Sequence, residues 1–451
     1  MEDFDEASTS FISWLHSNNT TISDKIELAD LRQHGAGRGV LSKEDIADDE
    51  ELFSIPRSSI LTIQTSNLSA AIKAKLDDPW IGLIAAMVFE HQQGPESKWK
   101  PYFDVLPTTF DTLMFWSEEE LKWLQGSAVV TKIGKESADA SFKDQILPLV
   151  RSHADDFRLA SVSDEDVLEL CHRMGSTIMA YAFDLEKPSN DEQAQGNEEW
   201  EEDEEENLHK GMVPLADMLN ADADRNNAKL FYEEDKVIMK SIRAIKSGEE
   251  IFNDYGPLPT ADVLRRYGYT TPNYAQYDVV EIPLHDIKSA ARIQAKTKEA
   301  QVEGRLQYLE TEDALDDAYD VARSGQEEVP QFSDELCVLV NTLTLPQGEF
   351  EQFKKRSKLP KPTLSAAAIA VLIAVVQTRQ TQHQDSSDDA SAMELDGQSA
   401  RRKSMAAQVI KGEVNVLQEA LDALRTMSSN TANDKRKATD DSLSTTKKHK
   451  R

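Results

Sequence analysis

Two polar side chains in the middle of the chain stand where they could hold and orient a reactant. Asn220 follows the largely apolar run 212–219, and Tyr255 lies in the sequence Asn-Asp-Tyr-Gly that ends at Gly256. An amide can donate and accept hydrogen bonds, and a phenol can donate one beside backbone that a glycine makes flexible. These residue types suit the orientation of a polar ligand. The simpler interpretation of Tyr255 is a tyrosine packed at a turn.

A glycine-rich segment near the start of the chain is a third candidate for ligand contact. Residues 34–40 read His-Gly-Ala-Gly-Arg-Gly-Val. The pattern Gly-x-Gly is common in turns, and here it does not open a helix in a strand-helix-strand unit, so it is not a dinucleotide-binding fingerprint. Taken alone, the segment is a weak signal.

Short strands and a hairpin are expected to position these residues. Two β-prone runs, 229–232 and 236–242, are separated by the polar turn 233–235, which predicts a hairpin between Asn220 and Tyr255. Further short strands are predicted at 26–31, 39–41, 51–55 and 60–63. Helices are predicted at 5–17, 81–90, 118–124, 142–150 and 164–183.

Several motifs in order resemble those of SET-domain lysine methyltransferases, in the branch related to the Rubisco large-subunit methyltransferase. The chain is most similar to the nuclear and fungal ribosomal-protein lysine methyltransferases of that branch, over roughly residues 20 to 425. The segments that carry the resemblance are 34–40, Pro56, 98–102, 179–183, Asp217-x-x-Asn220, 248–256 and 264–269.

This resemblance implies an α+β fold: a split SET domain of small twisted β-sheets with a helical insert, followed by an all-helical substrate-binding domain. The expected boundaries are 1–67 and 211–272 for the two parts of the SET core, 68–210 for the insert with its acidic loop, 273–430 for the helical domain and 431–451 for a basic disordered tail. The Gln/Ser/Asp-rich segment 380–403 is also expected to be disordered.

The resemblance further implies an S-adenosylmethionine-dependent protein-lysine N-methyltransferase. Its first expected substrate is a large-subunit ribosomal protein, and a histone or transcription factor is the second choice. The competing hypothesis is a catalytically silent SET-like module that binds basic proteins, as an assembly factor or chaperone does. Cofactor binding would separate the two.

The family's pattern assigns roles to individual residues of this chain. Cofactor contacts are implied for Ala36, Gly37 and Arg38 through their backbone, for the Asn220 amide, for Tyr181 by packing and for Ala221. Tyr255 is the implied catalytic residue, which holds the lysine amine or donor methyl in line. Tyr267 and Trp99 are candidate substrate contacts, and each could be a core aromatic instead, as could Tyr181.

One residue departs from the family's pattern. Relatives usually carry His directly after the Asn, and this chain carries Ala221. If that position contacts adenine through its backbone, binding survives. If an imidazole is needed, affinity falls, which keeps the silent-module hypothesis open.

The charge balance favours a cationic protein partner over nucleic acid. The chain has 81 acidic and 50 basic residues and a formal net charge of −31. Phosphate binding depends on Lys and Arg, so direct nucleic-acid binding is not expected. The segment 198–206 is almost entirely carboxylates and is either a solvated loop or a patch that steers a basic substrate.

The remaining composition predicts an intracellular protein that needs no metal. Cys171 and Cys337 are the only cysteines, and His172 has no further ligand at metal spacing. The apolar run 366–376 is shorter than the roughly 20 residues that span a bilayer, so no membrane partner is expected. Two basic clusters, 435–437 and 447–451, resemble a bipartite nuclear-localisation signal, which predicts a nuclear import receptor as partner and a nuclear location, with the cytoplasm as a second site. A merely solvated tail is the alternative.

Overall fold

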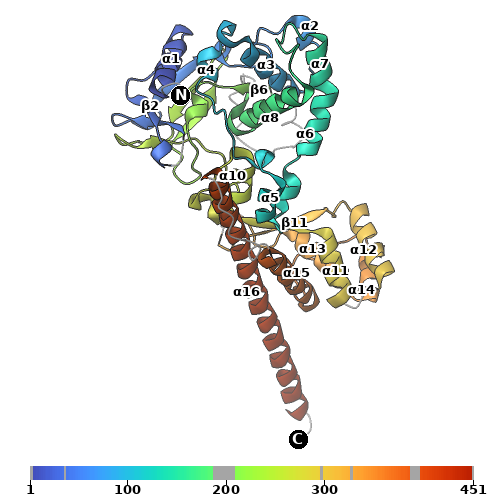
Figure 1. The fold of residues 1–451 in the computed structure, drawn as a ribbon. Helices are drawn as coiled ribbons and strands as arrows, with labels where there is room; N and C mark the ends of the chain where they lie inside the picture. Colours follow the sequence, from blue (N-terminus) through green and yellow to red (C-terminus); the bar gives the residue numbers. More distant parts are fainter. Residues whose placement is uncertain are drawn as a thin grey trace. The chain divides into compact units, whose positions relative to one another are not determined.

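The computed structural model describes residues 4–34, 37–185, 209–294, 298–325, 329–385 and 397–448, which fall into two compact units (Figure 1). The first unit comprises the residues up to Phe115, Ile133–Pro257 and Arg265–Gly268. The second comprises Trp116–Lys132, Leu258–Leu264 and the residues from Tyr269 onward.

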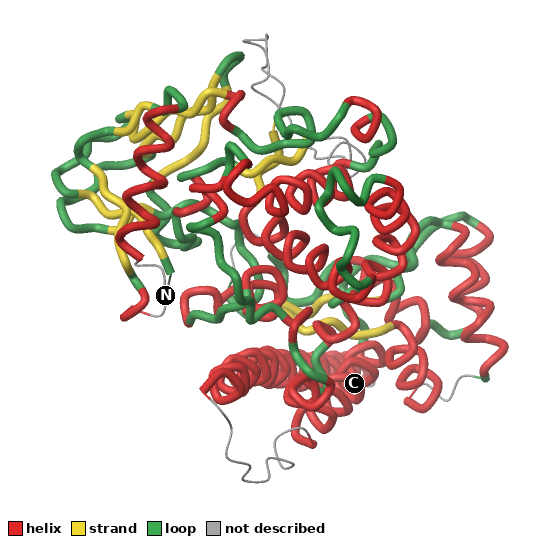
Figure 2. The backbone as a smooth tube through the Cα atoms, turned by 45° about the horizontal axis from the view of Figure 1, so that its top comes forward, coloured by secondary structure: helices red, strands yellow, loops and turns green. Residues whose placement is uncertain are grey.

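The strands of the first unit form small antiparallel sheets rather than one large sheet (Figure 2). The strand orders are β1-β4-β8-β7, β2-β3-β9 and β5-β6. The predicted hairpin is confirmed as β7 and β8, with Tyr232 opposite Val237. The β-prone piece 60–63 is not a strand and makes only an isolated bridge from Leu61 to Met212. The strands are β1 Thr21–Ile22, β2 Ile26–Asp30, β3 Arg38–Ser42, β4 Glu51–Pro56, β5 Ala182–Leu185, β6 His209–Met212, β7 Ala228–Tyr232, β8 Lys236–Ser241 and β9 Glu250–Ile251.

Helices of the first unit begin at the signals that the sequence provides. The Asp78 carboxylate accepts the Ile81 N–H ahead of α3, with Pro79 in the first turn, and the Ser163 hydroxyl caps α8 in the same way. Helices α3 and α8 pack against each other. The helices are α1 Phe4–Ser17, α2 Ala70–Lys73, α3 Pro79–Gln93, α4 Lys100–Phe103, α6 Lys135–Ser141, α7 Leu147–Ser152 and α8 Asp164–Tyr181, with short turns η1 Arg32–His34, η2 Arg57–Ser59, η3 Gly94–Glu96, η4 Leu113–Phe115, η7 Phe142–Ile146 and η8 Ala216–Met218. Helix α10 Thr260–Tyr267 is divided, with its residues up to Leu264 in the second unit and those from Arg265 in the first.

The second unit is mainly helical and has its own hydrophobic core, built largely from α11, α13, α15 and α16. It is not all-helical, because β10 and β11 pair antiparallel. The β-branched run Val279-Val280-Glu-Ile282 favours this strand locally. Its elements are α5 Glu118–Leu121, η5 Lys122–Leu124, η6 Ala128–Lys132, η9 Pro272–Tyr277, β10 Val279–Pro283, α11 Leu284–Gln294, α12 Glu299–Thr311, β11 Ala318–Ala322, α13 Asp334–Thr344, α14 Gln347–Lys355, α15 Ala366–Asp385 and α16 Gly397–Lys448.

The segment 116–132, expected within the insert of the SET core, packs in the second unit instead. A Cβ on Gly126 would lie 3.1 Å from the Gln382 carbonyl oxygen, so backbone approaches backbone there. The Arg379 guanidinium donates to the Gly126 carbonyl at 2.7 Å, and the Arg402 guanidinium donates to the Glu120 carboxylate at 2.9 Å. These partners lie more than 250 residues away in sequence, which is why local patterning missed the grouping.

A buried network ties the same segment to α15 and α16. The Glu413 carboxylate accepts the Ser127 hydroxyl at 2.5 Å and lies 2.6 Å from His383 Nε2. His383 Nδ1 lies 2.8 Å from the Arg379 carbonyl oxygen, which is an acceptor. The buried His383 ring is thereby held between the Arg379 carbonyl and the Glu413 carboxylate, which joins α15 to α16.

We expect Glu413→Ala to lower the free energy of unfolding by about 3 kcal/mol, because the buried Ser127 hydroxyl and the buried His383 Nε2 lose the Glu413 carboxylate as hydrogen-bond partner. Urea unfolding followed by circular dichroism measures the change. Glu419→Ala, which removes a half-buried carboxylate from the same helix, is the control and should cost less. Equal losses for the two variants would show that burial of the pair is unimportant.

Both segments predicted to be disordered are partly helical. Helix α15 continues to Asp385 and α16 begins at Gly397, so only 386–396 of the segment 380–403 lies outside the described residues. Helix α16 also continues to Lys448, through most of the tail expected to be disordered from residue 431. Extending an existing helix adds one hydrogen bond per ordered residue, which composition alone does not reveal. The acidic segment 198–206 lies outside the described residues.

The described residues contain neither a membrane-spanning helix nor a metal-binding cluster. None of the described helices is long and apolar enough to cross a membrane. Among the same residues, no group of three His, Cys, Asp or Glu side chains is placed to hold a metal ion.

Candidate active site

The three motifs singled out in the sequence meet in the first unit. Strand β3, which follows the glycine-rich segment, pairs with β9, so that Val40 lies opposite Ile251. Two residues beyond β9, the Asn253 N–H donates to the Asn220 carbonyl at 2.9 Å, and the Asp222 N–H donates to the Asn253 carbonyl at 3.2 Å. The backbone thus holds Asn220 directly beside the segment that leads to Tyr255.

The Asn220 side chain links all three motifs. Its Nδ2 donates to Glu250 Oε1 at 2.7 Å and to the Arg38 carbonyl at 3.4 Å. This fixes the plane of the amide. A Cβ on Gly39 would lie 3.0 Å from both Asn220 Nδ2 and Glu250 Oε1 and would overlap Leu31. Glycine at position 39 is therefore a packing requirement of this junction, which the sequence did not assign.

We expect Gly39→Ala to weaken S-adenosylmethionine binding about tenfold, because the added methyl displaces the Asn220 amide. Calorimetric titration measures the affinity, and thermal unfolding shows whether the chain remains folded. Gly304→Ala is the control: its Cβ meets open space within α12, and alanine is the better helix former. Unchanged affinity in the Gly39 variant would exclude a role for this packing in the site.

Tyr255 and Tyr267 form one aromatic stack. Their ring centroids lie 4.3 Å apart with an interplanar angle of 11°, and both rings are half-buried. Each tyrosine is followed by a glycine with positive φ, +78° at Gly256 and +76° at Gly268. Gly256 N–H donates to Asp254 Oδ1 at 2.7 Å, and Gly268 ends α10. The turns fix the two rings relative to each other and leave an aromatic wall with a phenol on each ring.

Comparisons with known proteins agree with this arrangement. A model of the SET domain matches residues 37–256. The chain is 34% identical to ribosomal lysine N-methyltransferase 4 of Saccharomyces cerevisiae, over 76% of this chain and 73% of that protein. It is 31% identical to N-lysine methyltransferase SETD6 of Homo sapiens, over 71% of this chain and 66% of that protein. The chain belongs to the SET-domain protein-lysine methyltransferases.

Solved structures support the same fold. Rubisco LSMT bound to AdoMet superposes with a TM-score of 0.65 at 18% identity, covering 94% of this chain and 92% of that one. The SET domain of LSMT bound to MeLysine and AdoHcy gives 0.64 at 16% identity, covering 94% and 92%. The expectations of an α+β SET fold, a protein-lysine N-methyltransferase and the cofactor S-adenosylmethionine are therefore confirmed.

In this SET enzyme, the backbone around Ala221 fits a role in cofactor contact. Ala221 forms a parallel β-bridge with Asn253. The two hydrogen bonds of this bridge are made by the neighbours of Ala221: the Asn220 carbonyl accepts the Asn253 N–H, and the Asp222 N–H donates to the Asn253 carbonyl. The N–H and carbonyl of Ala221 itself therefore point away from Asn253. A donor and an acceptor on one residue match the edge of an adenine ring. The replacement of the family's His by Ala leaves these groups in place.

The glycine-rich segment is only partly described. Ala36 lies outside the described residues. Gly37 is exposed, its carbonyl accepts the Leu31 N–H at 2.9 Å, and a Cβ there would meet no protein atom within 4 Å. The Arg38 guanidinium stacks 4.0 Å from the Phe4 ring and donates to the Val105 carbonyl at 3.0 Å. Burial lowers the pKa of Arg38. Its side chain is occupied in packing, so its backbone is the part left for a ligand.

Tyr181 ends α8 and is half-buried beside the carboxyl of Asp217. Burial, and secondarily the charge of Asp217, raises the pKa of Tyr181 to about 12. Its phenol therefore stays protonated at neutral pH and can donate a hydrogen bond. Asn220, Ala221, Tyr181, Tyr255 and Tyr267 all belong to the first unit.

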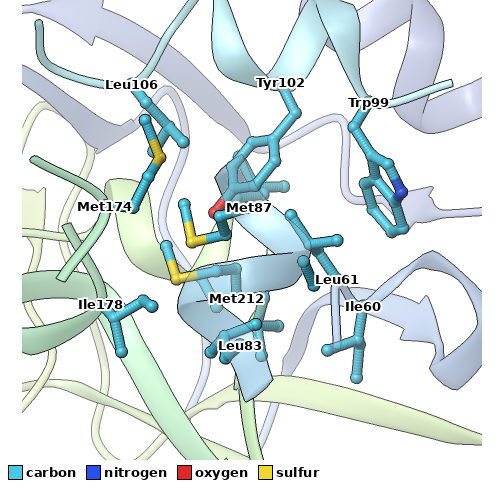
Figure 3. Packing of buried hydrophobic residues seen from close by; sticks show 14 of the residues in the cluster. Ile60, Leu61, Leu83, Met87, Trp99, Tyr102, Leu106, Met174, Ile178 and Met212 are labelled. Carbon is cyan, nitrogen blue, oxygen red and sulfur yellow. The ribbon is translucent and has the colours of Figure 1, made fainter. Parts of the chain in front are cut away.

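Trp99 does not belong to the site. Its side chain is 1% exposed and packs in the main hydrophobic cluster, 5.7 Å from the Trp14 ring (Figure 3). The prediction that Trp99 contacts substrate is wrong, because a fully covered indole has no face for a ligand. Its position is set by α1, whose Trp14 donates to the Lys98 carbonyl at 2.7 Å.

Asp217 is a feature of the site that the sequence did not assign. It lies three residues before Asn220 and is 5% exposed, and it accepts a hydrogen bond from the Tyr102 hydroxyl. Burial raises the pKa of Asp217 to about 8, against smaller lowering effects from Tyr102 and nearby backbone N–H groups. The Asp-x-x-Asn spacing marked the residue, but nothing local indicated that its carboxyl would be buried.

Proposed function

We propose that this methyltransferase acts on a lysine of a basic protein of the large ribosomal subunit. Support comes from its 34% identity to a yeast enzyme whose name gives ribosomal lysine as the target. The formal charge of −31 suits attraction of a Lys- and Arg-rich protein. The single observation that carries the proposal is that this yeast relative is matched over 73% of its length.

Within the site we assign Tyr255 to catalysis and Tyr267 to the wall of the lysine channel. Cofactor contacts are assigned to the backbone of Ala36, Gly37 and Arg38, to the Asn220 amide, to the Ala221 backbone and to packing by Tyr181. S-adenosylmethionine, when bound, supplies a methyl group on a positively charged sulfur. The stacked rings of Tyr255 and Tyr267 support their assignment, since two parallel faces form one side of a narrow channel.

The aromatic wall is assigned to lowering the pKa of the substrate lysine, so that its proton is lost to solvent more readily. A lysine with a reference pKa near ~10.4 is charged at pH 7, and forming the neutral amine costs about 4.6 kcal/mol. Rings that exclude water favour the neutral amine, which carries the lone pair that methyl transfer requires. The Tyr255 phenol holds that amine in line, which supplies orientation rather than proton removal.

Transfer of labelled methyl to fractionated substrates tests the proposal. The enzyme and labelled S-adenosylmethionine are incubated separately with purified large-subunit ribosomal proteins, small-subunit ribosomal proteins and core histones. The Tyr255→Phe variant is the control with impaired catalysis. We expect one large-subunit protein to be labelled, and peptide mass spectrometry then locates the lysine. Labelling of histones alone would reject the ribosomal assignment and leave the methyltransferase activity intact.

We also propose that the enzyme works in the nucleus. The basic clusters 435–437 and 447–451 support recognition by an import receptor. A fluorescent fusion with both clusters changed to Ala should move from nucleus to cytoplasm. A fusion that stays nuclear would reject the signal.

A further inference from the structure

The turn that carries Asn220 has a costly backbone conformation. Leu215 adopts a φ of +78° although it is not glycine, and its side chain is 2% exposed. A left-handed residue of this kind costs roughly 1–3 kcal/mol and persists only where its surroundings hold it. Within the turn, Asp217 N–H donates to the Val213 carbonyl at 3.2 Å, and Ala216–Met218 form a single helical turn. These local bonds do not explain what orients the turn toward β3.

Asn220 at the end of the turn is held by Asn253, Glu250 and Arg38. A further contact from outside the turn is the hydrogen bond from Tyr102 to Asp217. Tyr102 is 0% exposed, lies on α4 in the insert and is 115 residues away in sequence. Its ring stacks on Phe11 and Trp14 of α1, with centroids 6.0 and 6.4 Å away. Figure 3 shows the Tyr102 hydroxyl directed into the packed cluster. A ring clamped in this way holds its hydroxyl at a fixed point.

The Asp217 carboxyl is poorly satisfied otherwise. Its Oδ2 accepts the Tyr102 hydroxyl, whereas its Oδ1 is buried with no hydrogen-bond partner among the described residues. A buried polar group with few partners is unfavourable for stability. An apolar side chain would fill this core position at less cost, so the carboxyl serves something other than stability.

We propose that Tyr102 and Asp217 are positioning residues for methyl transfer, whose hydrogen bond sets the turn 215–220 and thereby the Asn220 amide. The inference rests on the proposed role of Asn220 in holding the cofactor. The aromatic cluster around α1 and α4 is then the rigid support of the cofactor site. The same cluster contains Trp99, the residue expected from the sequence to contact substrate.

Tyr102→Phe tests the inference because it removes one oxygen and keeps the ring. We expect the dissociation constant for S-adenosylmethionine, measured by calorimetry, to rise about tenfold. The KM for the cofactor should rise by the same factor, with kcat within about threefold of wild type, because Tyr255 and Tyr267 are untouched. Asp217→Ala should resemble Tyr102→Phe, and Asp217→Asn, which keeps an acceptor for the phenol, should bind more tightly than Asp217→Ala.

Ser97→Ala is the matched control for a loss of stability alone. The Ser97 hydroxyl donates to the Glu90 carboxylate at 2.6 Å, both residues are buried in the first unit, and neither has a hydrogen bond to the turn 215–220 among the described residues. We expect it to lower the melting temperature as Tyr102→Phe does, with cofactor affinity unchanged. If Ser97→Ala and Tyr102→Phe both weaken cofactor binding, each in proportion to its loss of melting temperature, the positioning role of Tyr102 is rejected.

Asn220→Ala tests the proposed role of Asn220 in cofactor binding separately from the positioning role of Tyr102 and Asp217. If Asn220→Ala binds cofactor as wild type does, the proposed role of Asn220 is wrong. The positioning role of Tyr102 and Asp217, which rests on it, is then wrong as well. If Asn220→Ala binds weakly and Tyr102→Phe binds normally, only the inference is wrong. Loss of turnover in Asp217→Asn with normal binding of cofactor and substrate would also overturn it, since Asp217 would then take part in proton transfer.

Discussion

Tyr255→Phe is expected to lower kcat by about 10²–10³ while leaving the affinity for S-adenosylmethionine unchanged. The ring, and with it the stack on Tyr267 at 4.3 Å, is retained, so the channel keeps its shape. What is lost is the one phenol assigned to hold the reacting amine, and removing a single preorganised hydrogen-bonding group from an active site costs about this factor. Single-turnover methyl transfer to the identified substrate measures the chemical step directly.

Tyr232→Phe is the control for this change. Its hydroxyl donates to the Asp184 carbonyl at 2.8 Å in the same unit and on the edge of a sheet, away from the stack. The control should keep its kcat, and calorimetry should give both variants the cofactor affinity of wild type. Full activity of Tyr255→Phe would remove the phenol from the mechanism. The catalytic assignment would then pass to the remaining groups of the stack.

Asp217→Asn is expected to raise the free energy of unfolding at pH 7 by up to about 4 kcal/mol. In the folded chain the pKa of Asp217 is about 8, against an ordinary value of 3.8. The folded state therefore keeps a proton that the unfolded chain releases above pH 4. Stability present below pH 4 is lost as the pH rises toward 8, and an amide has no proton to lose.

Urea unfolding of wild type and variant at pH 5, 6, 7 and 8 measures this difference. The gain in stability should grow with pH over that range and then level off. Asp24→Asn, which makes the same chemical change at an exposed position, is the control and should show no such trend. A constant difference between wild type and Asp217→Asn at every pH would show that the carboxyl ionises as freely in the folded chain as in the unfolded one.

Tyr255 and Asp217 answer different requirements of the same site, one for activity and one against stability. The Tyr255 phenol is expected to contribute to the rate, whereas the Asp217 carboxyl is expected to cost stability. Natural proteins commonly keep residues that lower stability where function needs them. If Asp217→Asn is more stable than wild type but binds the cofactor more weakly, the Asp217 carboxyl lowers stability and its hydrogen bond with Tyr102 supports cofactor binding.

Features that depend on neighbours along the chain could be predicted from the amino-acid sequence. The hairpin of β7 and β8 was predictable to within one residue, because β-prone residues and the polar turn 233–235 act locally. The spacing of Asn220, Tyr255 and Tyr267 identified the family, because these motifs are short and ordered. The α+β class also followed from the resemblance.

Which side chains are buried, and which residues from distant parts of the chain are in contact, depends on tertiary packing. Trp99 and Tyr102 both stood in one aromatic segment, yet packing against α1 buried the first entirely and directed the hydroxyl of the second to Asp217. The close approach at Gly39 and the grouping of 116–132 with the second unit depend likewise on distant partners. Local patterns record whether a side chain is apolar, but burial and pairing are set by contacts between residues that can lie far apart in the sequence.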